Sequence, residues 1–189
     1  MRKKFLALGI LVLAVGVGAA VAIAAGPGAG NAQAVIELSS INSPSFGAIA
    51  LPKPGAPGTL SSITTLSTQF AAIAGSDCGQ GSPRFSITVQ VSDHPVVTKN
   101  IFVYLGSPPN FNSCTPGWQN SGNLASDTTS WDTSQLDGGA FYDTAAGARA
   151  KYGNDKVVGV SLVVDGPSQD FVFNAVTLNN HVSHANFGT

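Results

Sequence analysis

The sequence predicts an all-β protein, an antiparallel two-sheet β-sandwich with one short helix, and two observations point to this fold class. Short segments alternate apolar and polar residues, with Gly, Pro, Asn and Asp between them, and strand patterns do not alternate with helix patterns. A length of 189 residues suits one main domain. Only 10% of the residues are charged, which excludes a solvated disordered chain and a basic nucleic-acid-binding protein.

The first segment has the pattern of a secretory signal. Basic residues at positions 2–4 precede an apolar run over residues 5–25, which predicts a hydrophobic helix and export. Cleavage is expected after Ala34 or, alternatively, nearer Ala25, because small residues precede both positions. Residues 1–34 are therefore assigned to a signal peptide. An uncleaved run would instead anchor the protein at the cell surface, and the membrane is expected as a partner in that case alone.

The β-sandwich domain is expected over residues 35–180. Strands are predicted at residues 35–38, 63–70, 85–92, 101–105, 157–164 and 171–178, with shorter strands near residues 118 and 131. The helix is predicted to begin at Asp143 or Thr144, which can cap it, and to end at Gly153. Residues 181–189 read as a polar C-terminal tail.

Three features of the exported part concern its chemistry. Without residues 1–34 the chain keeps six basic and ten acidic residues, a net charge of −4, which argues against nucleic acid as a partner. No phosphate-binding glycine motif is present, so no nucleotide is expected either. Cys78 and Cys114 are predicted to form a disulfide in an oxidising compartment, two free thiols being the alternative.

Four segments carry a resemblance to a known group of folds. They are Asp77–Phe85, Trp131, Val157–Asp165 and Phe171–Leu178. Their order resembles secreted bacterial jelly-roll domains of the galactose-binding-like and carbohydrate-binding-module type, a largely uncharacterised group, which implies a jelly-roll-like β-sandwich. In that group acidic residues are common where this chain has Asn174 and Ala175, so the resemblance gives no support for a metal at this place.

Patterns for catalysis are weak, and a non-catalytic protein is expected. Glu37 is the one glutamate after residue 34, so a pair of glutamates for glycoside hydrolysis is excluded. The nine aspartates mostly adjoin turn-forming residues, which suits turns and caps. An Asp-dependent glycoside hydrolase stays open as the less favoured alternative. No G-x-S-x-G elbow is present, and His94 lies in an expected turn.

Candidate binding residues come from the loop-rich region over residues 106–140 and from Tyr142 just after it. Trp118, Trp131, Asn120 and Tyr142 are candidates for ligand binding, because exposed rings stack on sugars and amides bond sugar hydroxyls. For both tryptophans a position in the core is the alternative.

A metal site is the second possibility in this region. Asp127, Asp132 and Asp137 are candidate ligands for calcium, ordinary loop acids being the alternative. No other cofactor is expected.

Together these observations predict a secreted, non-catalytic β-sandwich that binds glycan or another cell-surface component. The alternative is a structural extracellular or envelope protein that self-assembles or binds protein partners.

Overall fold

A computed structural model describes residues 12–14, 19–23, 35–41, 46–51, 58–73, 75–108, 111–126 and 129–183. The strands are β1 (Val12–Ala14), β2 (Ala19–Ile23), β3 (Val35–Ser39), β4 (Gly47–Ala50), β5 (Leu66–Ala72), β6 (Arg84–Asp93), β7 (Val96–Tyr104), β8 (Gln119–Asn120), β9 (Trp131–Asp132), β10 (Lys156–Val164), β11 (Asp170–Leu178) and β12 (His181–Ser183). The helices are α1 (Ala145–Tyr152) and the 3-10 turns η2 (Leu60–Ser62) and η3 (Leu124–Ser126).

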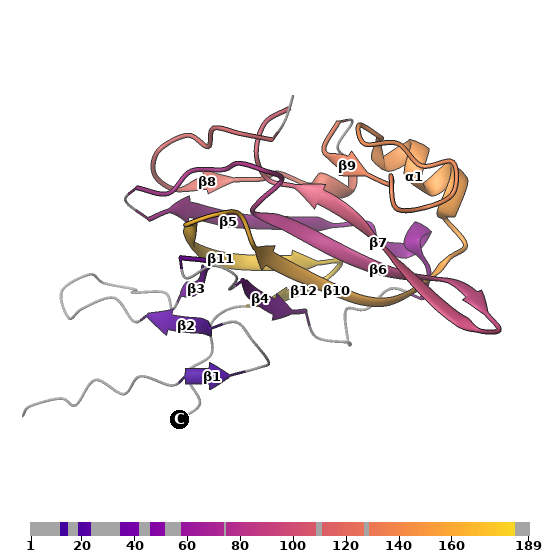
Figure 1. The fold of residues 1–189 in the computed structure, drawn as a ribbon, viewed down its shortest axis with the longest axis horizontal. Helices are drawn as coiled ribbons and strands as arrows, with labels where there is room; N and C mark the ends of the chain where they lie inside the picture. Colours follow the sequence, from indigo (N-terminus) through magenta and orange to yellow (C-terminus); the bar gives the residue numbers. More distant parts are fainter. Residues whose placement is uncertain are drawn as a thin grey trace, which may run out of the picture.

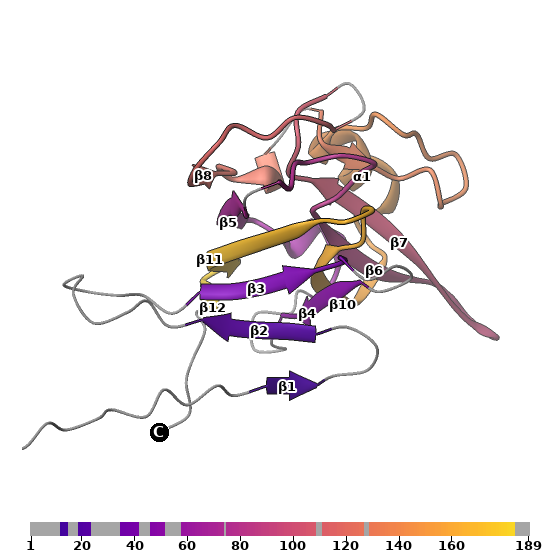
Figure 2. The same ribbon diagram turned by 60° about the vertical axis from the view of Figure 1, so that its left-hand side comes forward.

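These strands form two antiparallel sheets (Figure 1). One sheet has the order β1-β2-β3-β11-β5-β8, with β12 also paired to β11, and the other has the order β4-β10-β6-β7-β9. Figure 2 shows β1, β2, β3 and β11 side by side. The predicted all-β, two-sheet sandwich with one α-helix in the described residues is therefore confirmed at this level.

The core lies between the two sheets. In β6, Phe85, Ile87 and Val89 are fully buried and alternate with less buried polar residues, as the period-two pattern predicted. Phe171 and Phe173 of β11, which belongs to the other sheet, pack in the same core. Trp131 of β9 is also fully buried there. Burial of these large side chains is the main favourable term in folding.

The helix α1 forms where it was predicted. The Thr144 hydroxyl accepts a hydrogen bond from the Gly147 amide at 2.8 Å, which caps the first turn. Ala145 and Ala148 are buried in the core, and the Arg149 guanidinium donates to the Ile63 carbonyl at 2.7 Å. The helix thereby closes one end of the sandwich over η2.

The N-terminal segment differs from the expected hydrophobic helix. Its described residues form β1 and β2, and β2 pairs with the edge of β3 through Ala20–Ile23. Gly16 and Gly18 disfavour a helix here, and the unpaired edge of β3 supplies backbone partners for an extended segment. None of the described helices has the length and apolar character needed to cross a membrane.

The C-terminal tail also differs from expectation at its start. Asn179 has a positive φ of 54°, and the chain turns there so that β12 pairs with the last residues of β11. The first three residues of the segment predicted as a tail therefore extend the sheet. Asn174 and Ala175, singled out in the sequence, lie at a register shift between β11 and β5.

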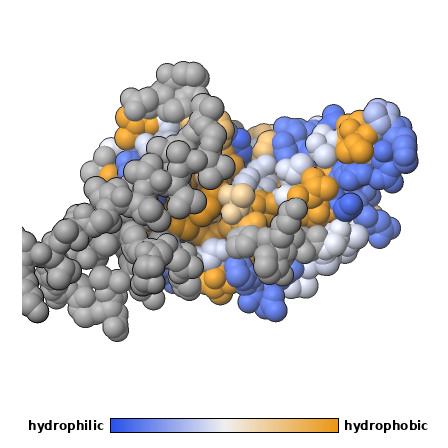
Figure 3. All heavy atoms as spheres, turned by 90° about the horizontal axis from the view of Figure 1, so that it is seen from below, coloured by the Kyte–Doolittle hydropathy of each residue, from blue (hydrophilic) through white to orange (hydrophobic). Residues whose placement is uncertain are grey.

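The β6–β7 hairpin projects beyond the rest of the sandwich (Figures 1 and 2). Its turn holds His94 and Pro95, and Val96 is 68% exposed. In the view from below, hydrophobic residues gather near the middle of the face, and hydrophilic residues separate the hydrophobic patches toward the right-hand end (Figure 3).

Candidate functional site

The disulfide joins two loops at one end of the sandwich. Cys78 precedes β6 and Cys114 follows β7, and their Cα atoms are 5.1 Å apart, so the predicted pairing is confirmed. The Asp77 carboxylate accepts hydrogen bonds from the backbone amides of Cys78 at 2.8 Å and Cys114 at 2.6 Å. The bond and the carboxylate together hold the two loops side by side. A disulfide with a buried cysteine is typical of an oxidising, extracellular environment.

Four aromatic rings cluster beside this disulfide, outside the main core. The Tyr104 and Phe111 rings stack with centroids 4.0 Å apart, and both side chains are buried. Phe141 and Tyr142 pack onto Phe111 at centroid distances of 5.9 and 5.7 Å. These two outer rings meet edge to face at 4.8 Å, and 45% and 50% of their surfaces are exposed. Two half-exposed rings are thus held by two buried ones.

A cavity of about 320 Å³ opens next to these rings. It is lined by Gln80, Gly81, Tyr104, Asn112 and Phe141, so amide side chains and aromatic rings share one surface. The Asn112 side-chain oxygen accepts from the Gln80 backbone amide at 3.3 Å, which ties the two loops together again. We call the four rings together with Gln80 and Asn112 the aromatic site.

One glycine is needed for this arrangement. Gly81 has a φ of 74°, and a Cβ atom there would lie 2.8 Å from the Tyr104 ring. A side chain at this position would therefore be strained by its backbone and would push against the ring. The glycine-rich segment before β6 lets the backbone approach Tyr104 closely.

A buried hydrogen bond fixes the inner ring. The Tyr104 hydroxyl donates to the Asp132 carboxylate at 2.7 Å. Burial raises the pKa of Tyr104, and the hydrogen bond to Asp132 raises it further. The other Asp132 oxygen accepts from the Ser134 amide at 2.9 Å. Both carboxylate oxygens of Asp132 thus already have protein donors.

The three proposed calcium ligands do not form a site in the described part of the chain. Asp127 lies outside the described residues, Asp132 is buried against Tyr104, and Asp137 is exposed and lines a different cavity. Over the described ranges, no three His, Cys, Asp or Glu side chains are grouped so that they could hold a metal ion. Asp132 has a structural role in orienting Tyr104.

The two tryptophans have opposite environments. Trp131 is fully buried, and its indole nitrogen donates to the Leu124 carbonyl at 2.9 Å, so it belongs to the core and offers no surface for a ligand. Trp118 is 55% exposed and stacks on no other described ring. Neighbouring Asn120 is exposed, and its side-chain oxygen accepts from the Gly122 amide at 2.9 Å.

Of the four predicted ligand-binding residues, Tyr142 alone belongs to the aromatic site. The sequence did not single out the other five residues, which come from three separate loops and one strand end: Gln80, Tyr104, Phe111, Asn112 and Phe141. A signal for Phe141 existed, because two adjacent aromatic residues follow the Gly138–Gly139 turn in an otherwise polar loop. The amides gave no such signal, since Asn and Gln are ordinary loop residues.

No protein-family model, curated protein or solved structure matches this chain.

Proposed function

We propose that the protein is a secreted, non-catalytic β-sandwich that binds glycan through the aromatic site. The observation that carries this proposal is the half-exposed Phe141 ring in the lining of a cavity that also presents Gln80 and Asn112, with the half-exposed Tyr142 ring packed edge to face on Phe141. The export pattern and the disulfide support an extracellular location. The jelly-roll resemblance supports the same class of binding domain.

The chemistry of the aromatic site suits a sugar. A pyranose ring has one face of C–H groups, which packs on an aromatic ring, and a rim of hydroxyls, which bond amide side chains. Phe141 and Tyr142 rest on the buried Phe111 ring, so little conformational freedom is lost when a ligand binds. The residues that line the cavity are uncharged, which favours a neutral ligand over an ionic one.

Binding to insoluble polysaccharides tests the proposal. The full chain should be retained by at least one member of a panel of polysaccharides and cell-wall preparations. The double variant Phe141→Ala/Tyr142→Ala should bind roughly ten- to a hundredfold more weakly, because each aromatic contact contributes about 0.5–1.5 kcal/mol beyond buried area.

Trp118→Ala is the matched control, since it removes an equally exposed ring away from the cavity. If the double variant kept the wild-type affinity and Trp118→Ala lost binding, the ligand would bind at the Trp118 loop and not at the aromatic site. Failure of the wild-type chain to bind any polymer would contradict glycan binding itself.

A structural, self-assembling extracellular protein is the second candidate, and exposed valines favour it. Val96 and Val97 on the projecting hairpin and Val158 on β10 present apolar surface to solvent. Sedimentation of the full chain at increasing concentration should then show association that Val96→Ser/Val97→Ser abolishes. A strict monomer would rule this candidate out.

A further inference from the structure

The two half-exposed rings of the aromatic site stand at a right angle to each other. The planes of the Phe141 and Tyr142 rings make an angle of 88°. Both rings also pack on the buried Phe111 ring, at interplanar angles of 56° and 36°. Packing on a common buried ring holds the two outer rings in this relation. The aromatic site therefore presents a corner to solvent and not a flat platform.

A corner and a platform suit different parts of a glycan. In an extended polysaccharide, successive sugar units present their C–H faces along a ribbon, so two aromatic rings must share a plane to stack on two of them. Phe141 and Tyr142 do not share a plane. Of the described residues that line the cavity, Phe141 alone carries a ring that is half-exposed, since Tyr104 is buried. One ring in the lining matches one sugar unit.

The size of the cavity agrees with a single unit. Its volume of about 320 Å³ is at the lower end of the roughly 300–1,000 Å³ found for small-molecule pockets. Gln80 and Asn112 lie in the same lining as Phe141. The ring and the two amides thus share a small space, in which one sugar unit can stack and form hydrogen bonds at the same time.

The turn that carries Gln80 holds this residue in an unusual backbone conformation. Gln80 and Gly81 are the central residues of a turn in which Gly79 and Ser82 exchange backbone hydrogen bonds at 2.9 and 3.1 Å. Their φ angles are 53° and 74°, as in a type I′ turn, where Asn and Gly are the common residues. Phe111 also has a positive φ, of 53°. Such backbone conformations are concentrated at functional sites, because the surrounding structure must stabilise them.

The hydrogen bond between these loops decides which amide atoms a ligand meets. The Asn112 side-chain oxygen accepts from the Gln80 backbone amide, so the NH₂ group of Asn112 is the part directed to donate to a ligand. The Gln80 side chain offers both a donor and an acceptor. A sugar hydroxyl also donates and accepts, so neighbouring hydroxyls of one unit can bond both side chains.

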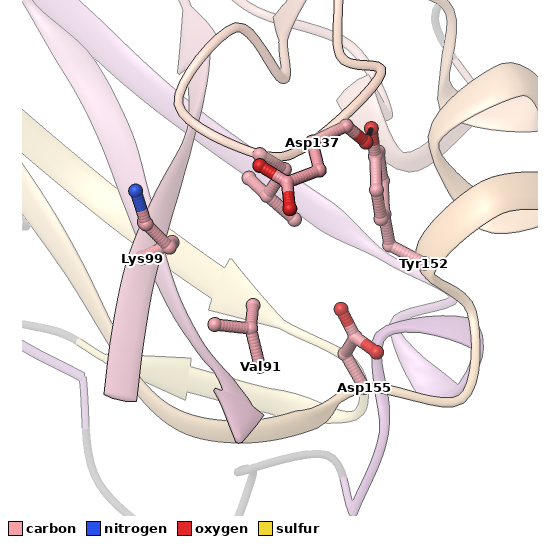
Figure 4. Close-up of a pocket in the computed structure, with 6 residues that line it drawn as sticks. Val91, Lys99, Asp137, Tyr152 and Asp155 are labelled. Atoms are coloured by element: carbon pink, nitrogen blue, oxygen red, sulfur yellow. Dashed lines mark hydrogen bonds between the residues drawn. The ribbon is translucent and has the colours of Figure 1, made fainter. Parts of the chain in front are cut away.

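A second cavity, between the β6–β7 hairpin and the end of α1, has a different chemistry (Figure 4). Its volume is about 230 Å³, and its lining contains three charged side chains, those of Lys99, Asp137 and Asp155. A neutral ligand would have to displace water from these groups. The one ring in its described lining, that of Tyr152, is buried. A neutral sugar therefore fits the aromatic site better than this cavity.

We infer that the aromatic site recognises a single neutral sugar unit, stacked on Phe141 and bonded through its hydroxyls by Gln80 and Asn112. Chain ends, branches and free sugars are then sufficient ligands, and an uninterrupted polymer chain is not required. The inference rests on the glycan binding proposed above and adds how much of the glycan is recognised.

Titration of the full chain with sugars of different length tests this inference. The probes are glucose and cellotetraose, mannose and mannotetraose, and N-acetylglucosamine and chitotetraose. For the pair that binds, the Kd of the tetrasaccharide should be lower than that of the monosaccharide by no more than about fivefold, because four equivalent units give a statistical factor of about four. A platform for several units would instead lower the Kd about tenfold or more, since each further stacked unit adds binding energy.

Gln80→Gly tests the role of the amide in the same assay. Glycine adopts a positive φ readily, so this variant keeps the turn and removes only the side chain. The Kd of the monosaccharide should rise about three- to tenfold, the effect of one lost hydrogen bond. Asn180→Ala, which removes an exposed amide from the turn between β11 and β12, is the control and should leave the Kd unchanged.

The length series uses the wild-type chain, and amide NMR spectra show whether each variant is folded. A tetrasaccharide Kd about tenfold or more below that of the monosaccharide would overturn the inference, and so would an unchanged Kd in folded Gln80→Gly. Polysaccharide binding, and with it the proposed function, would still stand in both cases. Absence of binding to every sugar and every polymer would contradict the proposed function together with the inference.

Discussion

Glu37 and Asp170 place two carboxyl groups close together on adjacent strands. Val172 pairs with Glu37 and Asp170 pairs with Ser39, so both acids lie on the face opposite to the core residues Leu38 and Phe171. Asp170 is 9% exposed, and one of its carboxylate oxygens has no hydrogen-bond partner. Burial raises the pKa of Glu37, and the neighbouring charge of Asp170 raises it further. Burial also raises the pKa of Asp170.

These raised pKa values predict the pH dependence of stability. A carboxyl group whose pKa is raised by folding binds its proton more tightly in the folded state. Its contribution to the free energy of unfolding is therefore greatest at a pH below the pKa of the unfolded chain. Stability should fall as the pH rises from about 4 through the raised values. Glu37→Gln should therefore be more stable than wild type at pH 7, by roughly 0.2–1 kcal/mol, and the gain should vanish at low pH.

Urea unfolding from pH 3.5 to pH 7.5 measures this effect. Asp93→Asn serves as the control, because it removes an exposed carboxylate from the projecting hairpin, on a different sheet from Glu37 and Asp170. If Glu37→Gln were less stable than wild type at pH 7, the two carboxyl groups would not repel each other.

At the level of single side chains, the sequence identifies residue types better than environments. Trp118 and Trp131 lie in similar polar contexts, yet one is exposed and the other fills the core. The difference arises from β9, which pairs with β7 and turns Trp131 inward, and a two-residue strand leaves no periodic pattern to recognise. Tyr142 was found because it is aromatic, but its packing on Phe111 depends on a loop more than thirty positions earlier.

At the scale of elements, the strands that alternate polar and apolar residues could be predicted, whereas the pairing of strands at the sheet edges could not. Residues 85–92 and 171–178 form most of β6 and β11. Each of these segments contains its own series of buried apolar residues, so its pattern can be recognised from the segment alone. The pairing of β2 with β3 and of β12 with β11 depends on edges made available by other strands, which no local pattern encodes.

The two loops joined by the disulfide should depend on it for both stability and binding. Cys78→Ser/Cys114→Ser removes a constraint across 36 positions, for which chain entropy predicts a loss of roughly 3–4 kcal/mol. Gln80 and Asn112 lie within four residues of the two cysteines, so affinity at the aromatic site should fall with the bond removed. Urea unfolding and polysaccharide binding of the same samples measure both effects.

Reduced wild-type protein is the control for this variant, because it lacks the bond but keeps the sulfur atoms. Both should show the same loss of stability. A variant with wild-type affinity despite lowered stability would show that Asp77, whose carboxylate bonds both cysteine amides, holds the loops without the disulfide.

At the scale of the whole molecule, the described core is contained within residues 36–178. The fold class was predictable because apolar alternation and turn residues recur along this range. The candidate site was not, since it forms where segments distant in sequence meet: three loops and a strand end contribute to the aromatic site. The sequence pattern therefore predicts the architecture, whereas the residues of the candidate site are brought together by tertiary contacts.

The position of the core predicts that residues 35–189 fold without the N-terminal segment. Removing residues 1–34 deletes β1 and β2, which pair at the edge of β3, and leaves the described core residues in place. The newly exposed edge carries Glu37, and a charged residue on an edge strand opposes pairing with another chain.

Circular dichroism and urea unfolding should therefore show a cooperative transition for the shortened chain, and polysaccharide binding should show the same affinity as the full chain at the aromatic site. Glu37→Val in the shortened chain should increase association, because the edge then loses its charge, and sedimentation measures that increase. A broad, non-cooperative transition of the shortened chain would mean that β1 and β2 are part of the folding unit, and the edge of β3 would then need them as a permanent cover.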